Sequence, residues 1–176
     1  LAHSPIIAMT GGRDPHTKFR GVYQEVDDIP AFETVTKYNA TVDAVERIPD
    51  MIRQAFRVAT SGNPGPVHLQ FQGNEGQVDV EEAEMEILCE QTFSQVPPFR
   101  PQPSADQVQT ALTLLESSDR PIIIAGGGVR SSNASTELIA LAEHLNIPVA
   151  TSLNGKDTIP GSHPLSVGVV GTYSRE

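Results

Sequence analysis

The chain has 176 residues and a formal net charge of −10, from 12 Lys and Arg against 22 Asp and Glu. Nucleic acids and anionic membrane surfaces attract clustered basic side chains, so this charge argues against both as partners. Cys89 is the only cysteine, which excludes an internal disulfide and a multi-cysteine metal site and fits the reducing cytoplasm. No apolar run approaches transmembrane length, and the first residues do not resemble a signal peptide. The chain lacks an initiator methionine, so we expect an excerpt of a longer protein.

The first part of the chain alternates between strand and helix signals. Residues 5–10 predict a short buried strand that ends at two glycines, and residues 13–20 predict a polar loop. Asp43 followed by Glu46 resembles a capping box, so a helix is expected to begin there and to end near Gly62. Val67, Leu69 and Phe71 then alternate with polar residues, which predicts a strand.

An acidic and proline-rich stretch over residues 73–103 predicts an interdomain linker, because it combines a glutamate run from Glu81 to Glu90 with four prolines. Ser104 and Gln107 then form a second capping box. This helix is expected to present its apolar positions on one face, at Val108, Ala111, Leu112 and Leu115.

A βαβ pattern follows the second helix. Residues 122–125 and 147–151 predict two parallel strands, and the helix between them is expected to be capped by Ser132 or Asn133. Its inward positions are expected to be Leu138, Leu141, Ala142 and Leu145. We therefore predict an α/β fold with parallel sheets flanked by helices, as two partial three-layer domains joined by the linker.

Three glycines at the end of the apolar run 122–125 make a candidate cofactor site: Gly126, Gly127 and Gly128. Gly126 and Gly128 match the start of a dinucleotide fingerprint, but Ser131 stands at the third position and no acidic residue ends the next strand. A standard NAD site is therefore disfavoured. Thr151 ends the next strand and Ser152 follows it, at an edge where hydroxyls are able to bind a ribose or a diphosphate. On spacing alone, a sharp structural turn explains the glycines equally well.

The remaining polar candidates are weaker. Gln24 has a side chain able to orient a keto acid, although spacing alone favours a surface position on a helix. His16 and His68 have no partners at metal-ligand spacing, and we predict no metal site within this chain. His68 alternates with apolar residues in its strand and is expected to be structural, and His163 before a proline is expected to lie in a turn.

Taken together, four stretches resemble the thiamine diphosphate-dependent, acetolactate synthase-like enzyme superfamily. They are Gly21-Val-Tyr-Gln-Glu-Val-Asp, Val35-Thr-Lys-Tyr-Asn, the segment from Ala55 to Leu69 with its Ser-Gly-Asn-Pro-Gly-Pro-Val, and residues 120–171. The resemblance implies three α/β domains in the whole protein. Residues 1–72 are then the C-terminal part of the pyrimidine-binding domain, and residues 104–176 the N-terminal part of the central domain.

The resemblance also implies a function. The whole enzyme is expected to use thiamine diphosphate and Mg²⁺ to join or cleave carbon–carbon bonds of 2-keto acids or diketones, as a homodimer or homotetramer. Gln24 is then a catalytic residue facing cofactor and substrate, and the cofactor-activating glutamate and the metal motif are expected outside residues 1–176. The 176-residue chain alone is expected to be inactive.

In this superfamily the central groove holds FAD, ADP or nothing, and the resemblance assigns that groove to Gly126, Gly127, Gly128, Thr151 and Ser152. The FAD-binding members have an arginine where this chain has Asn63. Losing a cation beside a diphosphate removes a charge-assisted contact, so Asn63 predicts weaker FAD binding. The alternatives to an enzyme segment are a non-catalytic nucleotide-binding α/β module and a structural subunit with an empty groove.

Overall fold

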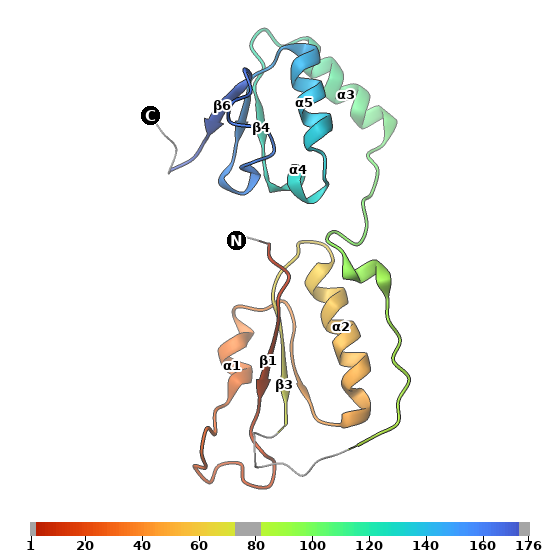
Figure 1. Cartoon of the computed structure of the whole chain (residues 1–176), viewed down its shortest axis with the longest axis vertical. Helices are drawn as coiled ribbons and strands as arrows, with labels where there is room; N and C mark the ends of the chain where they lie inside the picture. The colour runs from red at the N-terminus through yellow and green to blue at the C-terminus, as the bar shows by residue number, and fades with distance from the viewer. Residues whose placement is uncertain (1–2, 73–81, 173–176) are drawn as a thin grey trace. The chain divides into compact units, whose positions relative to one another are not determined.

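The structure is a computed structural model that describes residues 3–72 and 82–172 (Figure 1). The chain divides into two compact units, Leu1–Phe99 and Arg100–Glu176, and each is described by itself. The boundary between the units falls inside the predicted linker, whose residues 73–81, including Glu81, lie outside the described residues. The assignment of the two units to particular enzyme domains stays a prediction.

The first unit is built on a sheet of three parallel strands in the order β1-β3-β2. The strands are β1 (Ile7–Gly11), β2 (Asn39–Val42) and β3 (Val67–Phe71). Helix α2 (Ile48–Thr60) packs on one face of the sheet, and the short helix α1 (Asp28–Glu33) lies beside β2 and β3. This arrangement confirms the predicted fold class, in which helices flank a parallel sheet.

The core of the first unit forms where the alternation of β3 meets the apolar stripe of α2. Val67 and Leu69 are fully buried on the face that α2 covers, and Ala55 and Ala59 of the helix are buried against them. The small alanine side chains let the helix approach the sheet closely. The predicted alternating strand is therefore confirmed, and its apolar half provides the centre of the core.

The ends of α2 differ partly from the prediction. The Asp43–Glu46 capping box is wrong: a 3₁₀ turn, η1 (Val45–Arg47), precedes the helix, and no side-chain hydrogen bond caps either element. Pro49 in the first turn lacks an amide N–H, so one of the donors that would need a cap is absent there. At the other end Gly62 adopts a left-handed conformation with φ of 59°, as the predicted helix stop requires.

Strand β1 is less buried than the sequence predicts. It is an edge strand, hydrogen-bonded on one side to β3, and Met9 keeps 61% of its surface exposed. Ile6, just before the strand, is 55% exposed. The predicted full burial is wrong because apolar character alone cannot distinguish a central strand from an edge strand.

The second unit contains another parallel sheet, in the order β4-β5-β6. Its strands are β4 (Ile123–Ala125), β5 (Val149–Thr151) and β6 (Ser166–Val169). Its helices are α3 (Ala105–Glu116), α4 (Gly127–Ser131) and α5 (Ser135–Leu145), with a 3₁₀ turn, η3 (Leu153–Gly155), after β5. Leu138 and Ala142 of α5 are buried against Ala125, Val149 and Ile159, and together they form the core of this unit.

The helices of the second unit test several local predictions. The capping box of α3 is confirmed, because Ser104 Oγ accepts the Gln107 amide at 3.3 Å and Gln107 Oε1 accepts the Ser104 amide at 3.4 Å. The expected cap at Ser132 or Asn133 is wrong, since α4 occupies the preceding residues and α5 begins after Ala134 without a side-chain cap. Among the expected inward positions, Leu138 and Ala142 are buried.

One apolar prediction for these helices is wrong. Leu141, which was expected to point inward from α5, is 39% exposed. The apolar face of α3 stays largely uncovered within the second unit, since no residue of this helix is buried. Val108 and Leu112 of that stripe keep 42% and 38% of their surface exposed.

Candidate functional site

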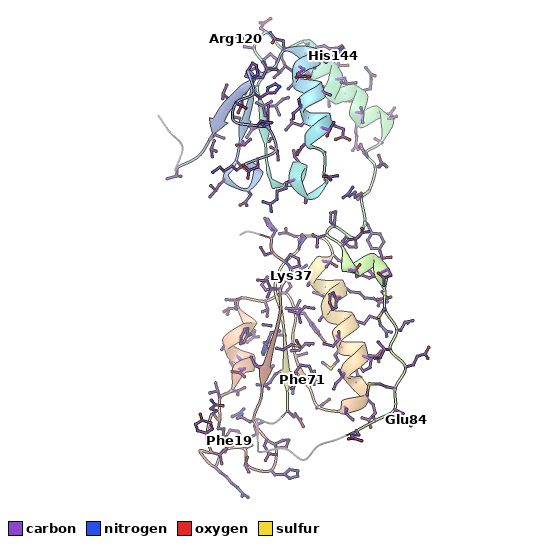
Figure 2. All side chains as sticks on the ribbon, in the orientation of Figure 1. Phe19, Lys37, Phe71, Glu84, Arg120 and His144 are labelled. Atoms are coloured by element: carbon purple, nitrogen blue, oxygen red, sulfur yellow. The ribbon has the colours of Figure 1, made fainter. Side chains whose placement is uncertain are left out.

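Gln24 lies in the loop that joins β1 to α1, not on a helix (Figure 2 labels Phe19 in the same loop). The surface-helix alternative is therefore wrong. Gln24 is exposed and adopts a left-handed backbone with φ of 55°. Its Nε2 atom donates a hydrogen bond to Tyr23 Oη at 3.3 Å. A non-glycine residue in this conformation is uncommon and is most often held there by the surrounding turn.

The loop that carries Gln24 is organised by charged side chains. Arg13 donates to Asp27 at 2.8 Å and so ties the two ends of the loop together. The Arg13 guanidinium also lies 4.9 Å from the centre of the Phe19 ring, and Lys18 Nζ lies 5.2 Å from the same ring. At the start of the loop, Asp14 accepts the His16 amide at 2.9 Å. The loop therefore has a defined conformation within the first unit.

His68 lies at the centre of the face of the sheet opposite α2. Its ring is fully buried, stacks on Phe32 of α1 with centroids 3.9 Å apart, and hydrogen-bonds through both nitrogens. The partners are Thr10 Oγ1 at 2.9 Å and Asn39 Oδ1 at 2.7 Å. Burial lowers the pKa of His68 below its ordinary value, and the nearby Asp28 carboxylate offsets part of that effect. These contacts support the structural role expected for His68.

A second polar contact lies near the carboxyl ends of the same strands. Gln70 at the end of β3 is buried, and its Oε1 accepts a hydrogen bond from Thr41 Oγ1 at 3.3 Å. A Cβ atom added to Gly12 would lie 2.6 Å from Gln70 Cγ. The glycine after β1 is thus needed for the close approach of Gln70. Sequence reasoning did not single out Gln70, because it stands among the polar positions of the β3 alternation and its burial depends on how that face packs.

The structure brings the glycine block together with the hydroxyl residues at the end of β5. The Ser152 amide donates to Ala125 O at 2.9 Å, directly before Gly126. A Cβ atom on Gly126 would lie 4.0 Å from Ser152 Oγ. Thr151 is buried, whereas Ser152 is half-buried and its hydroxyl accepts the Gly155 amide at 3.2 Å. The five predicted cofactor residues therefore share one edge of the second sheet.

Packing explains part of this glycine content. A Cβ on Gly127 would lie 3.2 Å from Asn154 Cβ, and a Cβ on Gly155 would lie only 2.2 Å from Ala125 O. Gly128 is exposed and has nothing within 4 Å of an added Cβ. The β4–α4 and β5–η3 turns therefore pack backbone against backbone, while Gly126 and Gly128 retain room beside them. Their assignment as cofactor contacts stays a prediction.

Asn63 lines a hollow of about 490 Å³ in the first unit, together with Lys37. Lys37 is labelled in Figure 2, and its Nζ donates to Val58 O at 2.6 Å and to Ser61 O at 2.9 Å. These are carbonyl groups at the C-terminal end of α2, where a cation is favoured by the helix dipole. The cation beside Asn63 is thus already engaged in capping α2.

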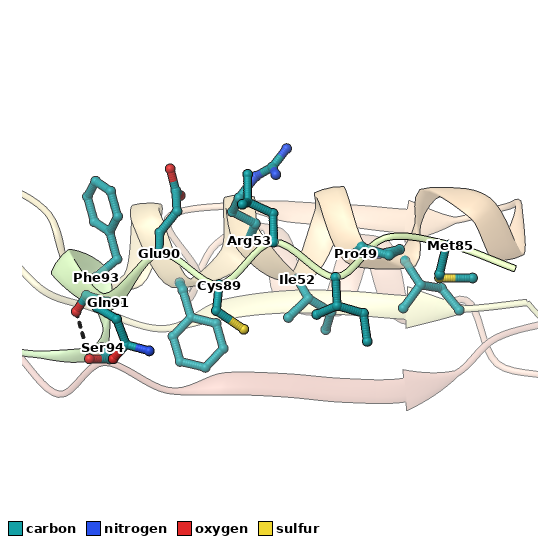
Figure 3. A pocket seen from close by; sticks show the side chains of 13 residues that line it. Pro49, Ile52, Arg53, Met85, Cys89, Glu90, Gln91, Phe93 and Ser94 are labelled. Atoms are coloured by element: carbon teal, nitrogen blue, oxygen red, sulfur yellow. Dashed lines mark hydrogen bonds between the residues drawn. The ribbon is translucent and has the colours of Figure 1, made fainter.

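A separate apolar groove of about 390 Å³ lies between α2 and the segment that follows residue 82 (Figure 3). Ile52 and Phe56 of α2 line it on one side, and Met85 and Cys89 line it on the other. Arg57 holds this segment through a bidentate ion pair with Glu90 that also lowers the pKa of the Glu90 carboxyl. This part of the predicted linker therefore packs on the first unit, and none of the predicted site residues lines the groove.

In residues 3–72 and 82–172, no group of three or more His, Cys, Asp or Glu side chains is arranged to hold a metal ion. The helices in the same ranges are all too short or too polar to cross a lipid bilayer.

The chain is similar to known proteins over almost all of its length. It is 38% identical over 174 residues to the probable acetolactate synthase large subunit of Methanocaldococcus jannaschii, covering 97% of this chain and 29% of that protein. It is 33% identical to the acetolactate synthase large subunit of Corynebacterium glutamicum, covering 96% of this chain and 26% of that protein. The glyoxylate carboligase of Escherichia coli O157:H7 is also 33% identical, with coverages of 95% and 27%.

These relatives are much longer than this chain, which spans under a third of their length. Residues 108–176 also match the family described as thiamine pyrophosphate enzyme, central domain. That match begins inside α3 and covers the glycine block and the whole second sheet. The chain is an acetolactate synthase-like member of the thiamine diphosphate-dependent enzyme family.

Proposed function

We propose that this chain is part of a thiamine diphosphate-dependent enzyme that joins or cleaves a carbon–carbon bond of 2-keto acids or diketones. The observation that carries the proposal is the 38% identity over 97% of the chain to an acetolactate synthase large subunit. Similarity that extends through both units supports a common enzyme and disfavours a nucleotide-binding module assembled from the second unit alone.

We also propose the domain assignment, which the same kind of comparison supports. The central-domain match over residues 108–176 supports placing residues 104–176 at the start of the central domain. Residues 1–72 then supply the C-terminal part of the pyrimidine-binding domain, and residues 73–103 connect the two. Exposed apolar side chains on the edge strand β1, such as Met9, support further packing partners for the first sheet in the whole protein.

Gln24 is the residue of this chain that we assign to the reaction. Thiamine diphosphate, bound with Mg²⁺ elsewhere in the enzyme, would supply an electron sink for cleaving or forming a bond to a carbonyl carbon. An exposed amide held on an ordered loop is able to donate to a substrate carbonyl oxygen and to accept from a hydroxyl group. Gln24 would therefore bind and orient the substrate, while residues elsewhere in the enzyme hold the cofactor.

The second unit offers a partial fit to a nucleotide such as FAD or ADP. Gly126 and Gly128 leave space beside the turn, and the Ser152 hydroxyl accepts the Gly155 amide while its own proton is able to reach a ligand oxygen. Asn63 is uncharged at the position where the resemblance implies an arginine in FAD-binding members. We therefore propose that FAD is bound weakly or not at all and that the groove serves a structural role.

The decisive experiment uses the full-length enzyme with thiamine diphosphate and Mg²⁺. Pyruvate, pyruvate with 2-ketobutyrate, glyoxylate and a cyclic diketone are tested separately, and consumption and products are followed by mass spectrometry. We expect turnover of at least one of them and a fall in kcat/KM of about 100-fold in Gln24→Ala, the cost typical of losing a group that positions the substrate. Turnover of none of these substrates would overturn the proposed function.

The similarity to glyoxylate carboligase supports a second candidate within the same reaction class. In that case glyoxylate is consumed faster than pyruvate. The matched control for both candidates is Gln54→Ala, which changes an exposed glutamine of the same chemistry on α2. It is expected to leave kcat/KM within about twofold, because surface substitutions change little.

The remaining proposals concern the setting of the enzyme. We propose a cytoplasmic homodimer or homotetramer, in line with the single cysteine and with an active site built between subunits. Light scattering of the full-length protein measures this directly. A monomer that retains full activity would overturn the proposed assembly without affecting the proposed reaction.

A further inference from the structure

The loop that carries Gln24 contains a carboxylate surrounded by backbone amides. Glu25 accepts hydrogen bonds from the amides of Phe19, Gly21 and Val22, with Gly21 N at 2.7 Å and Val22 N at 3.3 Å from Oε2. The Phe19 amide donates to the other carboxylate oxygen, Oε1. Three main-chain donors on one side chain make an anion nest, whose usual occupant is a bound anion.

The backbone is shaped to make this nest. Phe19 and Gly21 adopt left-handed conformations with φ of 68° and 67°, which turn neighbouring amides toward the same point. Glycine reaches that conformation without a steric penalty, but Phe19 does not, so the turn has to be stabilised by something else. The Glu25 amide also donates to Val22 O at 3.2 Å, which closes the same turn from the other direction.

The charge on Glu25 matches this environment. The pKa of the Glu25 carboxyl lies below its ordinary value, mainly because the Phe19 amide donates a hydrogen bond to it. The amides of Gly21 and Val22 and the Arg13 cation lower this pKa further, whereas partial desolvation raises it. Arg13 is held in turn by Asp27 at the far end of the loop. The carboxylate, the amides and this ion pair therefore restrain the loop from both sides.

Gln24 lies between the two parts of this network. It follows the turn that Glu25 closes and immediately precedes Glu25 in the chain, and its own backbone is left-handed. We propose that Glu25 is a positioning residue, whose carboxylate gathers the amides of the preceding turn and so fixes the direction in which Gln24 presents its side-chain amide. This inference rests on the proposed role of Gln24.

Substitution of Glu25 in the full-length enzyme tests the proposal. In Glu25→Gln the side-chain NH₂ group cannot accept hydrogen bonds, so at least one of the backbone donors loses its acceptor. A displacement of about 1 Å near a reacting group costs up to about 100-fold in rate. We expect kcat/KM to fall by about 10- to 100-fold in Glu25→Gln. Glu25→Asp, which keeps the charge on a shorter side chain, is expected to recover part of the loss.

Two further measurements separate positioning from simple loss of folding. Hydrogen exchange of peptides covering residues 16–27 is expected to accelerate in Glu25→Gln by about tenfold or more, while exchange in β3 and α2 is unchanged. Glu33→Gln, the same charge change at an exposed residue at the end of α1, is the matched control and is expected to alter neither exchange nor kcat/KM.

The outcomes separate the positioning role of Glu25 from the proposed function of the enzyme. Unchanged exchange in residues 16–27, or faster exchange with full activity, would overturn the positioning role of Glu25 and leave the proposed function intact. A wild-type enzyme without any keto-acid or diketone turnover would overturn the proposed function, and the role of Glu25 in catalysis with it. Loss of activity in Glu25→Gln with partial rescue in Glu25→Asp supports both.

Discussion

Gly155→Ala tests whether the glycine-rich edge of the second sheet is built for backbone packing. The added Cβ would lie 2.2 Å from Ala125 O, 2.9 Å from Ala125 C and 3.0 Å from Gly126 C. All three atoms belong to the backbone, so no side chain is able to rotate away. A separation of 3.0 Å from the oxygen requires a displacement of about 0.8 Å.

The expected cost follows from two contributions. Overpacking of a well-packed site destabilises proteins by about 1–3 kcal/mol. Ala125 O also accepts the Ser152 amide at 2.9 Å, so its displacement weakens a hydrogen bond with a net contribution of about 1 kcal/mol. We therefore expect Gly155→Ala to lower the free energy of unfolding of the second unit by about 2–4 kcal/mol.

The assay is urea denaturation of the full-length protein followed by pulsed hydrogen exchange, which reports each unit through its own peptides. The matched control is Gly161→Ala, because an added Cβ there has nothing within 4 Å and Gly161 lacks a left-handed backbone. It is expected to change the stability by less than about 0.5 kcal/mol. Equal stabilities for the two variants would refute the packing argument and would favour a ligand contact as the reason for the glycines.

The remaining predictions concern the first unit. Leu69→Ala, in a fully buried position of β3, is expected to lower the free energy of unfolding by about 2–5 kcal/mol in urea denaturation, whereas a cost below about 1 kcal/mol would contradict its place in the core. The lowered pKa of His68 means that the unfolded chain binds a proton more readily than the folded one. The contribution of the neutral His68 to the free energy of unfolding is therefore complete above pH 6.5, the ordinary pKa, and is lost as the pH falls below that value. His68→Gln is expected to flatten this dependence between pH 7 and 5 in urea titrations, and a parallel curve would show that other groups cause it. Glu90→Gln removes the charge that pairs with Arg57 and is expected to accelerate hydrogen exchange in residues 82–94; exchange as slow as in the wild type would show that apolar contacts alone hold this segment on α2.

Local sequence signals predicted the regular elements well where one physical preference dominated. The strand β3 and the capping box of α3 were predictable from the period-2 spacing of apolar residues and from short-range hydrogen bonds, so neighbouring residues carry the information. The burial of His68 and Gln70 on the polar face of β3 did not follow from that spacing. The Asp43–Glu46 pattern failed because Pro49 and the turn before it changed where α2 begins. The expected cap at Ser132 or Asn133 failed because a short helix, α4, intervened.

In the candidate site, too, some features could be predicted from the local sequence and others could not. The glycine block and Ser152 were expected at the same edge of the sheet because parallel strands end there, and the structure places Gly126 beside Ser152. Gln24 was chosen from its motif, but its left-handed backbone could not be predicted from spacing. Glu25 was part of that motif and was not singled out, although a carboxylate shortly after a glycine turn is a usable signal for an anion nest.

The amino-acid sequence by itself determined the family, the α/β class and the elements with strong local signals, such as β3 and α3, because these depend on motifs and on periodicity along the chain. The sequence did not reveal β2, β6, α1 and α4, which only the structure shows. The tertiary structure alone decided the contacts between distant residues. It showed that β1 is an edge strand, that Lys37 caps α2 beside Asn63, and that Gly155 lies against the Ala125 carbonyl. Such contacts join residues far apart in sequence, and their geometry depends on how whole elements pack, which no local pattern encodes.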